Sequence, residues 1–250
     1  MKITILGCGG SFGSPLAWQR HGNIDLNNKR NFRTRSSILI ELNNKRILID
    51  TSPDLRNQLY QAKCTNVDAV FYTHMHSDHT SGLPDMRAMS LINKKIIPAY
   101  MPAEMISEME SMYKYIFKGE KDYLPFMEIK ELKSSNKFYD INIETFKHNH
   151  GSIDVQTYKL GKFAYSTDIK KFYNSDLEKL KNLDLWIVGL LREDNHPSHA
   201  GLKEIMEYVN YLKPKKTIFT HMTALLDEEK LKSKCPNNVY PGFDGMVIDL

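Results

Sequence analysis

Hydrophobic positions along this chain fall into ten short segments, several of which alternate with polar residues or are rich in β-branched residues. Both patterns are typical of β-strands. Asn43-Asn44 separates two of these segments, and asparagine tolerates the positive φ of a tight turn, so a hairpin is expected there. We predict strands at residues 2–7, 37–42, 45–50, 67–73, 96–101, 141–147, 153–160, 162–166, 184–190 and 215–220.

Helical spacing of hydrophobic residues occurs between the strands, in some cases with proline in the first turn. Clustered strands with helices interspersed predict an α/β (α+β) fold in which two sheets pack face to face with helices outside them. No stretch resembles a linker, so residues 1–250 are expected to form a single domain. The predicted helices are Pro53–Ala62, Pro84–Leu91, Pro102–Phe117 and His199–Leu212, the last ending before Pro214.

The composition narrows the class of protein. With 41% hydrophobic and 26% charged residues the chain has an ordinary soluble composition. No apolar run approaches the roughly 20 residues of a spanning helix, so no membrane partner is expected. Cys8, Cys64 and Cys235 are widely separated and odd in number, which excludes a disulfide framework or a CxxC metal site and favours the cytoplasm.

The formal net charge of +4 is modest, and the basic residues are densest at residues 29–35. Such a patch is usually a solvated loop, although it also suits an anionic ligand. Arg33, Arg35 and Ser37 are therefore candidate contacts for a phosphate group.

The strongest chemical signal is His74-Met75-His76-Ser77-Asp78-His79, which follows the hydrophobic strand 67–73. In an extended turn the side chains at i and i+2 leave the same side, so His74 and His76 are suited to one ion while Asp78 and His79 face a second. Four potential ligands this close together are unusual for solvated loop residues. The segment predicts a metal site in a loop at the end of a strand.

One loop cannot complete two coordination spheres, and further ligands are available at other strand ends, in His150, Asp168 and His221. Each of these alone would more often be an ordinary loop residue. A mixed imidazole and carboxylate set suits zinc, manganese or iron. We predict two divalent metal ions per chain, with Asp168 bridging them and a shared hydroxide as nucleophile.

These residues resemble the metallo-β-lactamase superfamily, and within it the PhnP-like phosphodiesterases and the related ribonuclease Z. The resemblance implies an αββα sandwich with the metals at one edge of the two sheets. It also implies that His148 is a weaker ligand candidate than His150. The ligand set that it implies is His74, His76 and His150 on one ion and Asp78, His79 and His221 on the other, with Asp168 between them. The supporting segments are Gly7–Ser11, Arg33–Ser37, Leu48–Arg56 and Tyr165–Asp168.

In these phosphodiesterase relatives a histidine at the place of His199 serves as general acid, which the departing alkoxide requires. The resemblance therefore implies catalytic roles for His199 and for Asp78. The alternative for His199 is helix capping or packing. His196 is interpreted as a supporting residue. Asp50 is expected either to orient a ligand histidine or to cap a local turn.

The sequence departs from these relatives in two ways. Residues 14–32 contain no cysteine, so no third, structural metal is expected. Only 17 residues separate His150 from Asp168, which leaves no arm for transfer RNA. We therefore expect hydrolysis of small or cyclic phosphodiesters.

Several alternatives remain on the basis of sequence. They are a ribonuclease Z-type endonuclease acting on RNA, a thioester or lactone hydrolase, a di-iron oxidoreductase and a non-catalytic metal-binding protein. The methionine-rich helix around residues 101–112 is more typical of packing. It is also a candidate contact for a homodimer.

Overall fold

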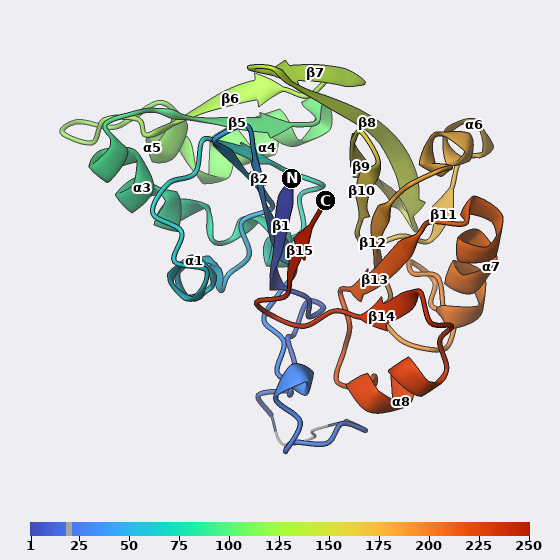
Figure 1. Cartoon of the computed structure of the whole chain (residues 1–250). Helices are drawn as coiled ribbons and strands as arrows, with labels where there is room; N and C mark the ends of the chain where they lie inside the picture. Colours follow the sequence, from blue (N-terminus) through green and yellow to red (C-terminus); the bar gives the residue numbers. More distant parts are fainter. Residues whose placement is uncertain (19–21) are drawn as a thin grey trace.

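The computed structural model describes residues 1–18 and 22–250, and two mixed β-sheets pack face to face in it with helices on their outer sides (Figure 1). The predicted αββα architecture is confirmed. The prediction of a single domain over residues 1–250 stays a prediction. Residues 19–21 belong to the segment for which no third metal is expected, and they lie outside the described residues.

The first sheet has seven strands in the order β15-β1-β2-β3-β4-β5-β6. The β2–β3 hairpin is confirmed, because Leu42 pairs with Lys45 while Asn43 and Asn44 have φ values of 50° and 58°. From β3 to β6 the strands are parallel. The strands are β1 (Lys2–Gly7), β2 (Ser37–Leu42), β3 (Lys45–Ile49), β4 (Ala69–Phe71), β5 (Ile97–Met101), β6 (Met127–Glu131) and β15 (Val247–Asp249).

The second sheet runs β11-β8-β9-β10-β12-β13-β14, and β7 pairs with β8 beside this path. Its last four strands, β10 and β12–β14, are parallel. The strands are β7 (Ser135–Phe138), β8 (Ile141–His150), β9 (Ile153–Leu160), β10 (Phe163–Ser166), β11 (Lys171–Phe172), β12 (Leu185–Gly189), β13 (Lys216–Thr220) and β14 (Val239–Pro241).

Both faces of the first sheet are buried, and its strands alternate between two apolar clusters. Ile38 and Ile40 face the second sheet, whereas Leu39 between them joins a cluster with the outer helices. Successive strand residues point to opposite faces, which explains the division. Helices α1, α3 and α4 cover the first sheet, and α6, α7 and α8 lie beyond the second (Figure 1). The helices are α1 (Leu55–Gln61), α2 (Ser77–Thr80), α3 (Met86–Asn93), α4 (Ala103–Met112), α5 (Lys114–Phe117), α6 (Asn174–Leu177), α7 (Leu202–Leu212) and α8 (Glu228–Ser233), with 3₁₀ turns at Lys29–Asn31, Leu83–Asp85 and Glu178–Leu180.

The predicted start of the helix at His199 is wrong. Helix α7 begins at Leu202, because Gly201 has an extended backbone and Ala200 N–H donates to the carbonyl oxygen of Ile169 at 2.7 Å. His199 therefore lies in the loop before the helix. The predicted helix over 102–117 is also interrupted, at Tyr113.

No helix among the described residues combines the length and hydropathy needed to cross a bilayer.

Candidate metal centre

The predicted ligands leave the chain at or just beyond the carboxyl ends of strands. In each sheet the relevant strands are parallel, so their carboxyl ends meet at one edge. A scaffold of this kind brings together side chains that are distant in sequence. The predicted ligands are His74, His76, Asp78 and His79 after β4, His150 at the end of β8, Asp168 after β10 and His221 after β13.

Three site residues occupy the left-handed backbone region. The φ values are 62° for Asp50, 50° for Asp168 and 58° for His221, each directly or closely following a strand. Residues other than glycine rarely adopt this backbone conformation. It persists where the surrounding structure enforces it. The sharp turns aim these three side chains back across the strand ends.

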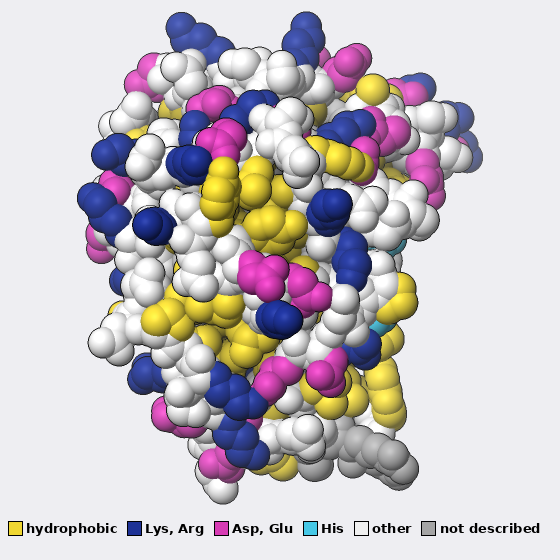
Figure 2. Space-filling view, turned by 90° about the vertical axis from the view of Figure 1, so that its right-hand side faces the viewer, with side chains coloured by type: hydrophobic (Ala, Val, Ile, Leu, Met, Phe, Trp, Pro, Cys, Tyr) yellow, Lys and Arg dark blue, Asp and Glu magenta, His cyan; other side chains and the backbone are white. Residues whose placement is uncertain are grey.

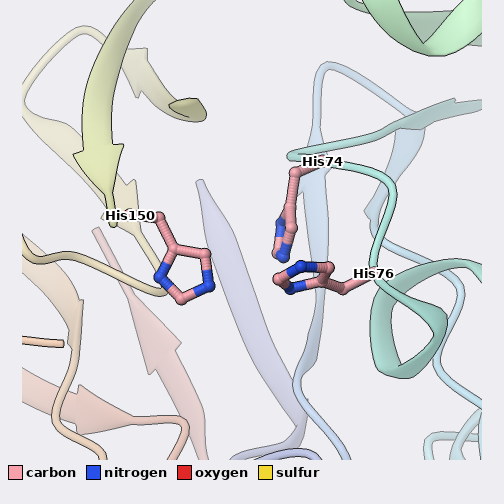
Figure 3. A group of neighbouring side chains, drawn as sticks. All are labelled: His74, His76 and His150. Carbon is pink, nitrogen blue, oxygen red and sulfur yellow. The ribbon is translucent and has the colours of Figure 1, made fainter. Parts of the chain in front are cut away.

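His74, His76 and His150 form the first group of potential ligands. Their coordinating nitrogens all lie within 4.8 Å of one another. Figure 3 shows His74 and His76, from the segment after β4, facing His150 from the opposite sheet. His74 and His150 are buried, whereas His76 is exposed to solvent. This half of the centre opens toward solvent at His76.

Asp78, His79 and His221 form the second group, and their ligand atoms also lie within 4.8 Å of one another. His221 Nε2 is 3.3 Å from Asp78 Oδ2, and His79 Nε2 is 3.4 Å from the same oxygen. Asp78 and His79 lie on the short helix α2 rather than on an extended turn. The helix turns these two side chains away from His76 and toward the second sheet's His221.

Asp168 lies between the two groups. Its Oδ2 is 3.1 Å from His79 Nε2, and its Oδ1 is 3.2 Å from His221 Nε2 and 3.8 Å from His150 Nε2. Both oxygens lie close to the second group, and Oδ1 also approaches His150 of the first, so this carboxylate could contact ions held by either group.

The buried nitrogens of this centre fit a metal. His74 Nε2 is fully buried and has no hydrogen-bond partner within the described part of the chain. An unpaired buried polar atom is costly, and a coordinated cation would satisfy it. Burial also lowers the pKa of His74 well below its usual value, which leaves its imidazole neutral and able to coordinate.

The carboxylates of the centre are held in their anionic form. Although burial alone would raise the pKa of Asp168, the imidazoles of His221 and His79 bring it well below the usual range. Burial opposes the charged form of His79 too, yet Asp168, Asp50 and Asp78 together raise the pKa of His79 well above its usual value. The carboxylates therefore attract a positive charge at this place, and a divalent cation would supply it.

Asp50 and Thr73 contact the Nδ1 atoms of candidate ligand histidines from both groups. Asp50 Oδ2 is 2.7 Å from His79 Nδ1 and accepts a hydrogen bond from the Thr73 hydroxyl at 2.8 Å. The same hydroxyl is 3.0 Å from His74 Nδ1. On the other side, the Ser198 carbonyl oxygen is 2.8 Å from His150 Nδ1. Sequence reasoning did not identify Thr73 or Ser198, since neither belongs to a ligand pattern.

The Asp50→Asn substitution is expected to lower metal affinity or activity by about 10–100-fold, the usual effect of losing a carboxylate behind a ligand histidine. The amide keeps the shape but loses the negative charge opposite His79 Nδ1. Metal titration and phosphodiester turnover would measure both effects. Asp68→Asn is the matched control. Asp68 lies just before β4, away from the centre, and forms an ion pair with Lys95 in which Oδ1 and Nζ are 2.8 Å apart. Equal behaviour of the two variants would contradict the role of Asp50.

His148 is buried beside the centre, with both ring nitrogens already paired. Nδ1 is 2.9 Å from the Thr157 hydroxyl, and Nε2 is 2.8 Å from the Thr167 carbonyl oxygen. Burial lowers the pKa of His148 to about 4. The structure thus brings His150, and not His148, to the other ligand residues.

His199 also lies at the centre, with Nε2 3.9 Å from Asp168 Oδ1 and its ring centroid 4.6 Å from that of His150. Its side chain is buried, and burial lowers the pKa of His199 to about 3. His196 is half-buried on the same loop, and its Nδ1 is 3.1 Å from the Ser198 hydroxyl. Only His199 of this pair lies within reach of the ligand side chains.

The three residues predicted to contact phosphate already form hydrogen bonds or ion pairs within the protein. The buried Arg33 guanidinium donates to the Thr223 carbonyl oxygen at 3.1 Å, and Arg35 pairs with Asp54 at 2.9 Å. The Ser37 hydroxyl donates to the carbonyl oxygen of Asp50 at 2.9 Å. These contacts hold the strand ends together, and they leave substrate contact by Arg33, Arg35 and Ser37 as predictions only.

The fold and the side chains define an α/β sandwich with a cluster of potential metal ligands at one edge. Residues 45–222 match the model of the beta-lactamase superfamily domain, and the chain belongs to this family. Its resemblance to the PhnP-like branch is confirmed by a crystal structure described as a new diphosphatase from the PhnP family. That structure has a TM-score of 0.92 and 27% identity, and the match covers 99% of this chain and 96% of the other.

Two curated relatives add to the comparison. An octanoyltransferase of Porphyromonas gingivalis is 30% identical over 258 residues, which cover 100% of this chain and 52% of the relative. A ribonuclease Z of Clostridium kluyveri is 26% identical over 188 residues, covering 73% of this chain and 54% of the relative. The chain thus spans about half the length of these relatives. Within the family, its relatives include phosphodiester-cleaving enzymes.

Proposed function

We propose that this protein is a metal-dependent hydrolase that cleaves small or cyclic phosphodiesters with the help of two divalent ions. The observation that carries the proposal is the convergence of seven imidazole and carboxylate side chains, from both sheets, in overlapping groups of potential ligands that include the unpaired, buried His74 Nε2. The similarity to the PhnP-family diphosphatase favours a phosphorus-centred reaction. The short segment between His150 and Asp168 favours a small substrate over transfer RNA.

The proposed ligand set follows the two groups of side chains. His74, His76 and His150 would hold one zinc, manganese or iron ion, and Asp78, His79 and His221 the other, with Asp168 in contact with both. Bound ions of this kind activate water and neutralise phosphoryl oxygens. Asp50 and Thr73 keep the imidazoles oriented, and the exposed side at His76 gives the substrate access.

His199 is proposed to donate the proton to the leaving oxygen. Burial disfavours the protonated imidazole, whereas the Asp168 carboxylate, 3.9 Å from Nε2, favours it and raises the pKa of His199 relative to burial alone. Its Nε2 faces the carboxylate between the two ligand groups, so a phosphate placed there would have its leaving oxygen within reach.

The His199→Ala substitution is expected to reduce hydrolysis of an ester with an alkoxide leaving group by about 10²–10⁴-fold, the usual contribution of a general acid. Release of p-nitrophenolate needs little protonation, so an ester with that leaving group should lose far less activity. Comparing the two leaving groups, together with metal content, would test the role. Loss of metal from the variant would instead identify His199 as a ligand. His196→Ala separates the roles of the two loop histidines.

The experiment that tests the proposed function is turnover of bis(p-nitrophenyl) phosphate and of 2′,3′-cyclic nucleotides after loading with zinc or manganese. Metal-dependent release of product is expected from both. RNA 3′-end cleavage without turnover of the small esters would favour a ribonuclease Z-type enzyme. Absence of all turnover by a metal-loaded protein would favour a binding protein and contradict the proposal.

A second candidate is an acyl thioester hydrolase. The observation that favours it is the 30% identity, along the whole of this chain, to a relative named octanoyltransferase. Water activated at a metal centre attacks a thioester carbonyl as it does phosphorus. Octanoyl thioester hydrolysis that exceeds phosphodiester hydrolysis in kcat/KM would establish this alternative.

A further inference from the structure

Phe12 and Trp18 form an exposed aromatic pair in the segment before β2. Their ring centroids are 5.2 Å apart with an interplanar angle of 78°, and the side chains are 64% and 56% exposed. The chain's other tryptophan, Trp186, is fully buried. Two large rings left this accessible and touching each other form an apolar surface of a kind that commonly marks a binding site.

The turn that carries Phe12 is bonded to the metal edge. Gly10 N–H donates to the Met222 carbonyl oxygen at 3.1 Å, and Met222 N–H donates to the Cys8 carbonyl oxygen at 2.8 Å. A side chain added at Gly10 would lie 3.4 Å from the carbonyl oxygen of His221. Phe12 is therefore two residues along the chain from Gly10, whose backbone bonds to Met222, the residue after the candidate ligand His221.

Residues 22, 23 and 33 of the segment also contact the loop that follows His221. The Arg33 guanidinium donates to the Thr223 carbonyl oxygen, and Asn23 N–H donates to that of Ala224 at 2.9 Å. Gly22, with φ of 68°, packs so closely on Ala224 that a Cβ would lie 1.9 Å from its carbonyl oxygen. These contacts hold both ends of the segment against the loop that follows the candidate ligand His221. Figure 2 shows hydrophobic and histidine side chains close together along the right-hand edge of its view.

We propose that Phe12 and Trp18 bind a planar aromatic part of the substrate, such as a nucleobase, at the rim of the metal centre. This inference rests on the proposed phosphodiester hydrolysis and names its substrate class as nucleoside phosphodiesters. Aromatic side chains stack on bases of any sequence, because every base presents a π-face. Arg33, which is buried and bonded to the Thr223 carbonyl oxygen, supports the segment that carries these rings.

The first test compares two esters with the same leaving group, thymidine 5′-(p-nitrophenyl phosphate) and ethyl p-nitrophenyl phosphate. In the wild type the thymidine ester should have the higher kcat/KM. Phe12→Ala and Trp18→Ala should each lower the ratio of the two kcat/KM values about tenfold, the usual order of a lost stacking contact. Tyr60→Ala is the matched control, since Tyr60 is 81% exposed on α1, and it should leave the ratio unchanged.

The second test measures binding without turnover. Trp18 is the exposed tryptophan, so adenosine should quench the protein's fluorescence saturably, whereas ribose should not. Phe12→Ala should weaken the adenosine Kd about tenfold. If neither ester is hydrolysed but this quenching is found, the proposed function fails while the aromatic site stands.

An unchanged ester ratio, together with non-saturable quenching, would overturn the inference. So would a change in oligomeric state in Phe12→Ala without a change in the ratio, because the pair would then be a contact between copies of the chain.

Discussion

Asp168→Ala is expected to abolish metal-dependent hydrolysis, with a loss of kcat/KM on the order of 10³-fold or more. The side chain lies 3.1 Å from His79 Nε2 and 3.2 Å from His221 Nε2, between the two ligand groups. Its removal would take a ligand from both proposed ions, so the effect should exceed the roughly 10–100-fold loss that follows removal of a supporting residue. Kinetic assays and metal analysis of the purified variant would measure the loss.

The matched control for this variant is Asp184→Ala. Asp184 directly precedes β12, away from the carboxyl-end edge, and pairs with Lys215 at 2.8 Å. A surface ion pair of this kind contributes little to stability. Asp184→Ala should keep both metal and activity. Full activity in Asp168→Ala would show that the carboxylate is not part of the centre.

Metal removal is expected to lower the melting temperature as well as abolish activity. One ion at 100 times its Kd stabilises the folded state by about 2.7 kcal/mol. In a chain of this size each kcal/mol corresponds to roughly 2–4 °C. Two ions should therefore raise the melting temperature by about 10–20 °C, because ions that bind only the folded state stabilise it and would satisfy the unpaired, buried His74 Nε2.

Differential scanning calorimetry of the chelated and reloaded protein would measure this shift. His79→Ala supplies the comparison, since a variant that cannot complete the second ligand group should show a smaller difference between the two states. Identical melting temperatures with and without metal, in the wild type, would contradict the proposed coupling of metal binding to stability.

The sandwich could be predicted from sequence because its central strands are long and apolar. Ile38, Leu39 and Ile40 in β2 show both the alternation and the burial on two faces. Several other strands were not predicted. β14 and β15 have three residues each, and β7 has the polar sequence Ser135–Phe138, so pairing with neighbouring strands stabilises them in spite of weak local preference.

The types and the order of the candidate ligands could also be predicted, since four of them lie in one segment after a strand. Their geometry could not. The placement of Asp78 and His79 on α2 depends on how the chain turns after His76. The conformation of the loop that carries His199 depends on the backbone hydrogen bond from Ala200 N–H to the Ile169 carbonyl oxygen. Contacts between distant segments of the chain have no local signal in the sequence.

The choice between His148 and His150 shows the same limit. Both residues lie near the end of β8, two positions apart, and so point to the same side of the strand. His148 is paired through both nitrogens with residues of β9 and the segment after β10. Only the partners distinguish a packing histidine from a candidate ligand. These partners come from strands brought together by the fold.

The most direct test of the account is a crystal structure of the zinc-loaded protein, with anomalous diffraction recorded at the zinc edge. Two anomalous peaks are expected. One should lie among His74, His76 and His150, and the other among Asp78, His79 and His221, with Asp168 in contact with both. A single peak outside these groups, or no peak in zinc-saturated crystals, would contradict it.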